Sequence, residues 1–142
     1  MRFDENETDP FIIMSHFYLD AMRVFTKRVG MSFSRIDVMH ELFHAGEISQ
    51  MELQRRLDME GALMTRFAKQ MEAEGLVMRR VDPKDNRYTL IKLSPAGEAL
   101  LDKMDELGSA YQTQLMEGID DEELVILAKV LKRLYYNLSR ME

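Results

Sequence analysis

The chain has 142 residues, 46% of them hydrophobic, no cysteine and a formal net charge of −6. This length suits one domain with a modest core, and the lack of cysteine excludes disulfides, thiolate metal sites and cysteine-based redox switching. No apolar run reaches the ~18 residues of a membrane-spanning helix, and the acidic start lacks the apolar segment of a secretory signal. We therefore expect a cytoplasmic protein with no membrane partner.

Charge is distributed unevenly along the chain. Residues 54–92 contain nine basic and six acidic side chains, a net charge of +3, so the two flanking segments together carry −9. Solvated helix faces can produce such segregation. The pattern also suits one basic surface that meets an anionic partner.

The first part of the chain is predicted to be helical. A helix from about Asp9 to Val29 carries a broad apolar stripe at helical spacing, and a second helix spans about Ser34 to Ala45. A glycine follows each of these helices, as is common at helix C-termini. A short third helix begins at Ser49, and Glu52 lies three residues later, where it would complete a capping box.

The middle of the chain changes its periodicity. A fourth helix from about Glu60 to Glu74 places Leu63, Phe67 and Met71 on one apolar stripe. Two short alternating segments, "LVMRRV" and "RYTLIKL", then flank a turn at Pro83–Asn86. This arrangement predicts a β-hairpin.

Two more helices complete the predicted order. A fifth helix starts at Ser94, with Pro95 in its first position, and runs to about Met116. A sixth helix runs from Asp120 to about Met141. Three helices followed by a hairpin, with a helix-turn-helix formed by the third and fourth helices, predict a mainly α fold: a winged helix-turn-helix with a small β-hairpin wing.

The terminal helices carry more apolar surface than a three-helix core needs. We expect these N- and C-terminal helices to be dimerisation helices that pack against a second copy of the chain. A symmetric dimer would present its two helix-turn-helix units about one DNA turn, ~34 Å, apart. The alternative is a monomer that buries both stripes in its own core.

The segment "EAEGLVMRRVDPKDNRYTLIKLSPAGEALL", residues 72–101, resembles the multiple antibiotic resistance regulator (MarR) family of bacterial transcription factors. The family pattern there is Glu-x-x-Gly-Leu-Val, then Arg, an Asp-Pro-x-Asp-x-Arg wing and Leu-Thr-x-x-Gly. This chain carries "GLV", "DPKDNR" and "LSPAG" in that order. The upstream stretch "MSFSRIDVMHELFHAGEISQMELQRRL" is similar to the second and third helices of the family.

The resemblance implies a single MarR-type domain over residues 1–142. Residues 31–97 would form the DNA-binding lobe, and residues 1–30 and 98–142 would form the dimerisation helices. It also implies a homodimer that binds double-stranded DNA at a pseudo-palindromic operator. The fourth helix would enter the major groove, and the wing would reach the adjacent minor groove.

Three charged residues lie at the tip of the expected wing. Arg87 matches the family's minor-groove arginine, and Asp85 matches the acidic residue that steadies it. This fits the negative potential of a narrow A·T-rich minor groove, which attracts an inserted arginine. Lys84 is a further candidate for DNA contact. The alternative is a solvated hairpin tip.

The fourth helix departs from the family pattern at its start, "EGALMTRFAKQ". Family members often carry small polar residues there, whereas Glu60 would repel phosphate or accept a hydrogen bond from cytosine. The remaining candidates for DNA contact are Ala62, Thr65, Arg66, Lys69 and Gln70. Arginine and lysine contact guanine edges or phosphates, and alanine or threonine can pack on a thymine methyl.

The start of the third helix offers two further candidates. Ser49 and Gln50 could bond the DNA backbone through side chains and backbone amides. The acidic start of the fourth helix leaves another interpretation open, in which the winged helix binds protein and not DNA.

The resemblance also implies control by a small aromatic or lipophilic effector that binds between the dimerisation helices and the DNA-binding lobe. Methionine and aromatic side chains can line a deformable pocket. The alternative is plain core packing. The residues of this expected effector site are Met14, Phe17, Tyr18, Met39, Phe43 and Tyr111.

The stretch "HELFH", residues 40–44, matches the His-Glu-x-x-His pattern of zinc peptidases. Such a site needs a third ligand and an open position, and the other histidine of the chain is His16. A regulatory metal site is a second interpretation of the same histidines. We expect ordinary helix residues, with no metal, no cofactor and no enzymatic activity. The sequence therefore predicts a homodimeric, ligand-responsive transcriptional repressor.

Overall fold

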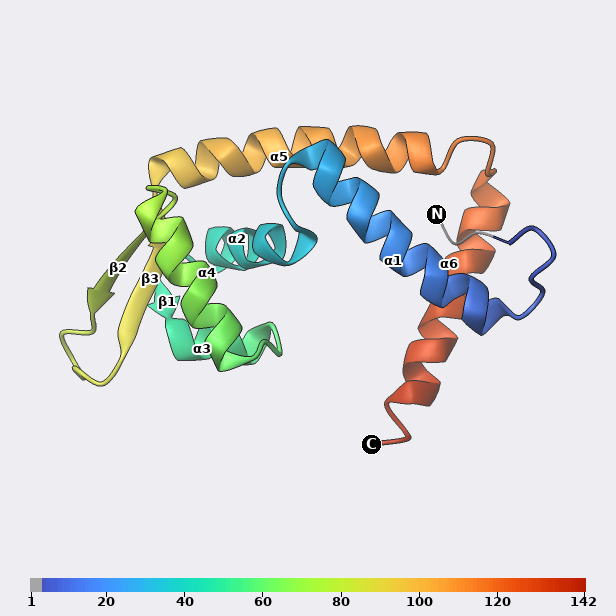
Figure 1. The fold of residues 1–142 in the computed structure, drawn as a ribbon. Coiled ribbons are helices and arrows are strands. Elements are labelled where there is room, and N and C mark those ends of the chain that lie inside the picture. Colours follow the sequence, from blue (N-terminus) through green and yellow to red (C-terminus); the bar gives the residue numbers. More distant parts are fainter. Residues whose placement is uncertain (1–3) are drawn as a thin grey trace. The chain divides into compact units, whose positions relative to one another are not determined.

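The computed structural model describes residues 4–142 (Figure 1), so the first three residues of the expected dimerisation segment 1–30 lie outside the described residues. The chain forms two compact units, one that ends at Tyr111 and one that begins at Gln112. Helix α5 (Pro95–Leu115) contributes to both units, because the boundary falls within its last turn.

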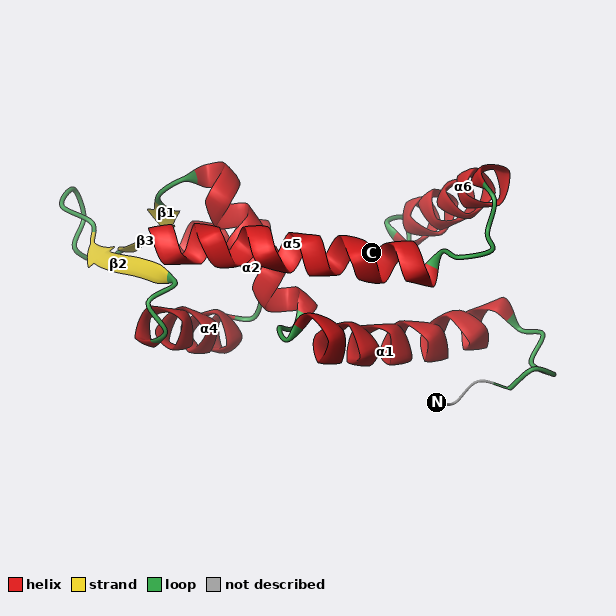
Figure 2. Ribbon diagram, turned by 90° about the horizontal axis from the view of Figure 1, so that it is seen from above, coloured by secondary structure: helices red, strands yellow, loops and turns green. Residues whose placement is uncertain are grey.

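The first unit contains a helix-turn-helix and a hairpin. Its elements, in chain order, are α1 (Pro10–Val29), α2 (Phe33–Ala45), β1 (Ile48–Ser49), α3 (Gln50–Arg56), α4 (Gly61–Ala73), β2 (Val77–Val81), β3 (Thr89–Leu93) and most of α5. In Figures 1 and 2 the β2–β3 hairpin projects beyond the helices of this unit. This winged helix-turn-helix confirms the predicted fold class.

Helix starts follow the local sequence. Asp9 accepts a hydrogen bond from the Phe11 backbone N–H (2.8 Å), and Pro10 occupies the first position of α1. Ser32 caps α2, so this helix begins at Phe33, one residue before the predicted start. Ser94 caps α5 by accepting from the Gly97 backbone N–H at 3.0 Å. Short polar side chains thus satisfy backbone donors at each of these helix starts.

The sheet has three antiparallel strands in the order β1-β3-β2. Strand β2 pairs with β3 from Val77 opposite Leu93 to Val81 opposite Thr89. On the other side of β3, Ile48 lies opposite Ile91. Sequence reasoning missed β1, because a strand of two residues has no measurable alternation. Because β1 directly precedes α3 and pairs with β3, it fixes the start of α3 to the base of the wing.

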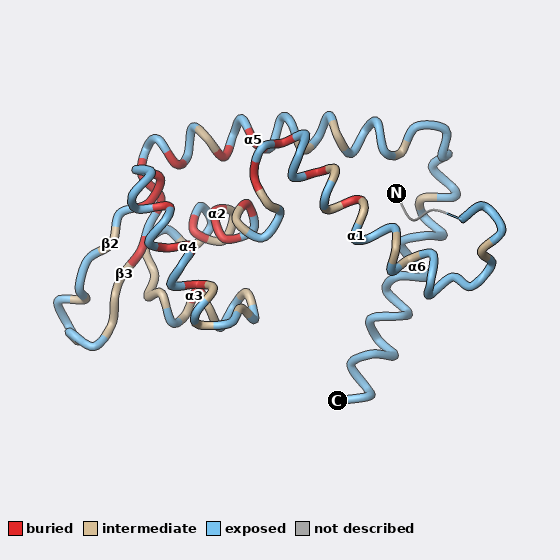
Figure 3. The backbone as a smooth tube through the Cα atoms, in the orientation of Figure 1, coloured by how far each residue is buried: buried red, intermediate tan, exposed pale blue. Residues whose placement is uncertain are grey.

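The core lies in the first unit, where α2, α3, α4 and the sheet meet (Figure 3). Phe67 and Met71 of α4 are buried as predicted, but Leu63 is only half-buried, and Met64 instead is fully buried. Ala68 completes the buried face of this helix. The largest fully buried side chains are Met39, Leu42, Leu53, Met64, Met71 and Ile91.

The second unit consists of the end of α5 and of helix α6 (Asp121–Leu138). Asp120 accepts from the Glu123 backbone N–H, and the Glu123 side chain accepts from the Asp120 backbone N–H, so α6 starts with a capping box. No residue of α6 is buried (Figure 3). Within residues 4–142, no helix combines the length and the apolar character that crossing a membrane requires.

Candidate nucleic-acid interface

Helix α4 presents one polar face to solvent. The five residues predicted to contact DNA on this helix are all exposed. Their spacing of three and four places them on one side, while Met64, Phe67, Ala68 and Met71 face the core. The exposed face consists of Ala62, Thr65, Arg66, Lys69 and Gln70.

The two cations of this face have no acidic partner within residues 4–142. Neither Arg66 nor Lys69 forms an ion pair there, and the Arg66 guanidinium lies 5.9 Å from the centroid of the Phe67 ring. By contrast, Arg79 and Arg80 of β2 pair with Glu72 and Glu47. The basic charge counted from the sequence is therefore partly neutralised within the fold, and α4 carries cations that remain available to an anion.

The start of α4 lacks a side-chain cap. Glu60 occupies the N-cap position and is exposed, but its carboxylate makes no capping hydrogen bond. Gly61 lies close to α3, because an added Cβ would be 3.3 Å from the Oε1 atom of Gln54. The turn between α3 and α4 also places Asp58 at a positive φ of 46°.

The start of α3 is organised around Ser49 and Gln50. The Ser49 hydroxyl oxygen accepts from the Glu52 backbone N–H at 3.1 Å, as predicted. The Glu52 carboxylate, however, accepts from Arg55 and Arg56 and does not complete a capping box. These hydrogen bonds hold the pKa of Glu52 at about 2, well below its ordinary value of 4.5.

Gln50, the first residue of α3, bonds a side chain of the wing. Its Oε1 atom accepts from Nη1 of Arg79 at 3.4 Å. The family pattern predicted an arginine after Gly-Leu-Val, but the sequence predicted no contact for Arg79 or Arg80. These contacts have no local pattern, because Arg79 meets Gln50 across 29 residues and Arg80 meets Glu47 across 33 residues.

The tip of the wing is closed by short-range hydrogen bonds. The Asp82 backbone N–H donates to the Tyr88 carbonyl at 2.9 Å, and the Asp82 carboxylate accepts from the Lys84 backbone N–H at 2.8 Å. The Lys84 side chain is exposed, and its ammonium has no ion-pair partner in the part of the chain that the structure describes.

Asp85 holds Arg87 through its backbone and its side chain. The Arg87 backbone N–H donates to Oδ1 of Asp85 at 3.1 Å, and the guanidinium donates through Nη2 to Oδ2 at 2.7 Å. The Arg87 guanidinium lowers the pKa of Asp85, chiefly through these side-chain hydrogen bonds. The Arg87 side chain nevertheless stays 78% exposed. Its direction is fixed while much of its surface is open to a partner.

The six residues of the expected effector site lie in different environments. Met39 is fully buried in the core, and Met14 is half-buried on α1. The half-buried Tyr111 donates through its hydroxyl to the Ala21 carbonyl at 2.9 Å. The other three, on α1 and α2, are exposed, namely Phe17, Tyr18 and Phe43.

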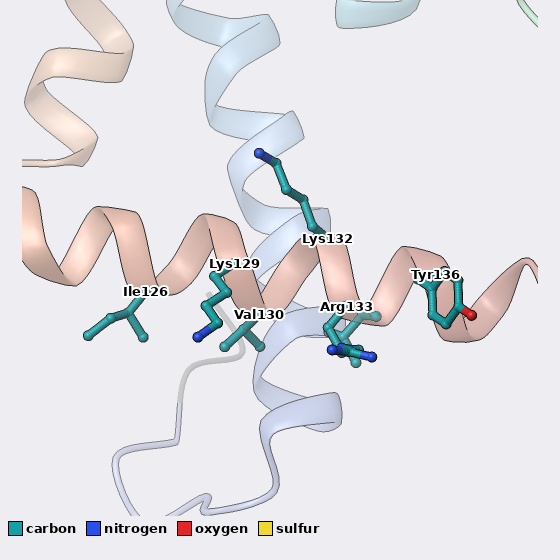
Figure 4. Close-up of a pocket in the computed structure, with 7 residues that line it drawn as sticks. Ile126, Lys129, Val130, Lys132, Arg133 and Tyr136 are labelled. Carbon is teal, nitrogen blue, oxygen red and sulfur yellow. The ribbon is translucent and has the colours of Figure 1, made fainter.

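An open groove of about 730 Å³ lies along α6 (Figure 4). None of the six expected effector residues lines it. It is lined by Ile126, Lys129, Val130, Lys132, Arg133, Leu134 and Tyr136.

The histidines of "HELFH" lie side by side on α2. The rings of His40 and His44 stack with centroids 6.4 Å apart, and Nε2 of His40 lies 2.8 Å from Oδ1 of Asp105 on α5. His16 is half-buried on α1. Residues 4–142 contain no group of three or more His, Asp or Glu side chains that could hold a metal ion.

Comparison with known proteins decides the family. Residues 31–89 match the model of the MarR family. The uncharacterized HTH-type transcriptional regulator YdgJ of Bacillus subtilis is 34% identical over 113 residues, which are 80% of this chain and 69% of that protein. The chain belongs to the MarR family. The predicted family is thus confirmed, and this MarR-family protein is a winged-helix, DNA-binding transcriptional regulator and not an enzyme.

Solved structures share the MarR fold at lower sequence identity. A mutant of E. coli MarR complexed with operator DNA has a TM-score of 0.77 and 21% identity, over 89% of this chain and 99% of that chain. The regulator PcaV of Streptomyces coelicolor in complex with its natural ligand has a TM-score of 0.79 and 14% identity, over 95% of this chain and 97% of that chain. At these identities the likeness shows the fold alone.

Proposed function

We propose that this MarR-family regulator is a homodimeric repressor that binds a pseudo-palindromic operator and is released by a small-molecule effector. The observation that carries the proposal is the exposed face of α4, whose two cations have no acidic partner among the described residues. The same lobe carries the exposed Arg87 at the tip of its wing. A helix and a hairpin that present cations from one lobe suit the two grooves of a DNA duplex.

Helix α4 is the element that would read bases in the major groove. Arg66 and Lys69 would contact guanine edges or phosphates, and Ala62 or Thr65 would pack on thymine methyl groups. Gln70 lies on the same exposed face and would bond adenine or phosphate. The acidic N-cap of α4 disfavours a close approach to phosphate at this end of the helix. Base recognition would therefore rest on the residues that follow it, in the middle of α4.

The wing and the start of α3 would fix the lobe on the backbone and in the minor groove. Arg87 would enter the minor groove in the direction that Asp85 imposes. Ser49 and Gln50 would bond phosphate at the start of α3. Lys84 at the hairpin tip would add a weaker contact with phosphate.

Exposed apolar residues on the terminal helices support the homodimer. In α1, Phe11 is 73% and Tyr18 is 61% exposed, and in α6, Val125 is 67% and Tyr135 is 76% exposed. Apolar surface of this extent is typical of protein interfaces. We propose that residues 1–30 and 98–142 form the dimer contact and that residues 31–97 form the DNA-binding lobe.

PcaV, solved with its natural ligand, supports an effector site in this chain. We propose a small aromatic or lipophilic compound that contacts some of the six residues named above for this site. Such a ligand releases DNA only if it binds the free shape more tightly than the DNA-bound shape. Among these residues, the half-buried Tyr111 connects α5 to α1 through its hydrogen bond to the Ala21 carbonyl.

The central test is a titration of the purified protein with duplex DNA, including the promoter DNA beside its own gene, at several salt concentrations. Binding through several phosphates gives an affinity that falls steeply as salt rises. A footprint with two symmetric halves would support the pseudo-palindrome. Failure to bind any duplex at low salt contradicts the proposal.

The dimer has a separate test on α6. Val130 is 50% exposed, and Lys132 points to the opposite side of this helix (Figure 4). We expect Val130→Glu to dissociate the dimer in sedimentation experiments and to weaken operator binding. Lys132→Glu, which introduces the same side chain on the other side, should leave the dimer intact. Equal effects of both variants would contradict a dimer contact through the Val130 side of α6.

A further inference from the structure

Arg79 on β2 connects three elements of the DNA-binding lobe. Its Nε and Nη2 atoms donate to the two carboxylate oxygens of Glu72 on α4, at 3.1 and 3.0 Å. Its Nη1 atom donates to Oε1 of Gln50 at the start of α3, at 3.4 Å. The Arg79 side chain is only 20% exposed, so it lies largely beneath the surface that its partners form.

The chemistry of the two groups fixes the orientation of Gln50. A guanidinium only donates hydrogen bonds, so Gln50 must turn its carbonyl oxygen to Arg79. The amide nitrogen, which carries two N–H donors, then points away from Arg79. Gln50 is the first residue of α3, so its amide donors lie at the start of this helix.

We propose that Arg79 is a positioning residue for DNA binding, which orients the Gln50 amide toward a DNA phosphate and ties the base of the wing to α4 through Glu72. Arg79 itself does not contact DNA. This inference rests on the proposed function, since it assumes that the lobe binds a duplex.

Arginine suits this role better than lysine. Its planar fork reaches both oxygens of Glu72 and still has a third nitrogen for Gln50, whereas an ammonium is a compact point charge without this geometry. The pairing also neutralises Glu72, whose carboxylate would otherwise repel phosphate from the end of α4. The Arg79 guanidinium lowers the pKa of Glu72, chiefly through the side-chain hydrogen bonds between them.

A double-mutant cycle on the intact protein tests the proposal. The duplex is first selected from a randomised library with the wild-type protein. We expect Gln50→Ala to weaken binding about tenfold, the loss of one hydrogen bond to a charged acceptor. Arg79→Lys, which keeps the charge, should weaken DNA binding by a similar factor. The double variant should lose no more than either single variant, because both changes remove the same contact.

The dependence of affinity on salt provides an independent readout. Neither Gln50→Ala nor Arg79→Lys removes a cation that neutralises phosphate, so the slope of log affinity against log salt should equal that of the wild type. Arg79→Met combined with Glu72→Gln, which removes the cation together with the carboxylate that it neutralises, should also keep this slope. A slope reduced by about one in this double variant would show direct phosphate contact and overturn the proposal.

Arg80 offers a matched control, because it is the next residue on β2 and pairs with Glu47 and not with α3 or α4. We expect Arg80→Lys to weaken binding much less than Arg79→Lys does. Gln50→Glu keeps an acceptor for Arg79 but removes the amide donors, so it should fold normally and still lose DNA affinity. Unchanged affinity in Gln50→Glu, or additive losses in the cycle, would overturn the inference. Failure of the wild type to select any duplex would instead contradict the proposed function.

Discussion

Asp85 and Arg87 form an ion pair across the tip of the wing, with Oδ2 and Nη2 2.7 Å apart. The pair leaves the Arg87 side chain 78% exposed. An exposed ion pair adds little to folding stability. We propose that the pair limits the directions of the guanidinium before it meets DNA, which would reduce the entropy lost on binding.

This relationship predicts the effect of removing the Arg87 side chain. We expect Arg87→Ala to weaken operator binding about 10- to 100-fold and to lower the salt slope by about one, while the dimer stays intact. Lys84→Ala is the control, because its ammonium has no fixed direction, and it should cost less. Affinity that is unchanged in Arg87→Ala, measured by fluorescence anisotropy, would refute a minor-groove role of the wing.

Arg66 is expected to carry base recognition on α4. Arg66→Ala should weaken binding and relax the preference for guanine at one position of each half-site. The measurement is selection of bound sequences from a randomised library by wild type and variant. Lys103→Ala is the control, because it removes an exposed cation that lies on α5, and it should leave the selected sequence unchanged. An identical preference in Arg66→Ala would move base recognition to other residues of α4.

Burial separates two methionines of the helix-turn-helix. Met64 is 0% exposed, whereas Met51 is 64% exposed. We expect Met64→Ala to reduce the free energy of unfolding by about 2–5 kcal/mol, from lost apolar burial and the cavity left behind. Met51→Ala should change it by about 0.5 kcal/mol or less. Urea unfolding at one fixed protein concentration measures the free energy of unfolding of both variants. Equal decreases in the two variants would contradict the described core.

Alanine substitutions at two glycines of α5 are expected to change the free energy of unfolding in opposite directions. A Cβ on Gly97 would press into the carbonyl oxygen of Leu76, whereas a Cβ on Gly108 would lie 3.6 Å from the Phe25 ring. Gly97→Ala should therefore destabilise the fold by about 1–3 kcal/mol. Gly108→Ala should raise the free energy of unfolding by about 0.5–1 kcal/mol, because alanine favours helix. Thermal unfolding compares the two variants with the wild type. A higher melting temperature for Gly97→Ala than for Gly108→Ala would contradict these predictions.

The low pKa of Glu52 predicts a dependence of stability on acid pH. Its pKa is lowered to about 2, so its pairing with Arg55 and Arg56 contributes fully above the ordinary value of 4.5. The contribution is lost as pH falls from about 4.5 through about 2. Glu52→Gln should therefore flatten the loss of stability in this range, as measured by urea unfolding at each pH. Glu60→Gln, which alters a carboxylate without a capping bond, is the control, and equal flattening would contradict the assignment.

The fold could be predicted because its helices are long and periodic. The stripes and caps identified α1, α4 and α6 within a few residues, and the order of elements then allowed few topologies. One position of the α4 stripe was nevertheless wrong, since Leu63 is half-buried and the adjacent Met64 fills the core. Neighbouring residues of a helix point about 100° apart, so two adjacent apolar residues do not decide which side of the helix faces the core.

The candidate interface was predictable only where its contacts are local. Asp85 and Arg87 lie two residues apart, so the "DPKDNR" turn itself brings them together. The pair of Arg79 with Gln50 joins segments 29 residues apart and leaves no local pattern. Charge counting also treated paired and unpaired arginines alike, because neutralisation depends on partners that only the fold brings near.

The strand order β1-β3-β2 leaves the outer edge of β2 without a strand partner in the described sheet. Edges of this kind can recruit strands of other chains and start aggregation. Here the edge strand carries two consecutive arginines, and Pro83 follows just beyond its end. Charge and proline both oppose the addition of another strand. The wing can therefore project into solvent in the DNA-free protein without becoming a template for intermolecular sheets.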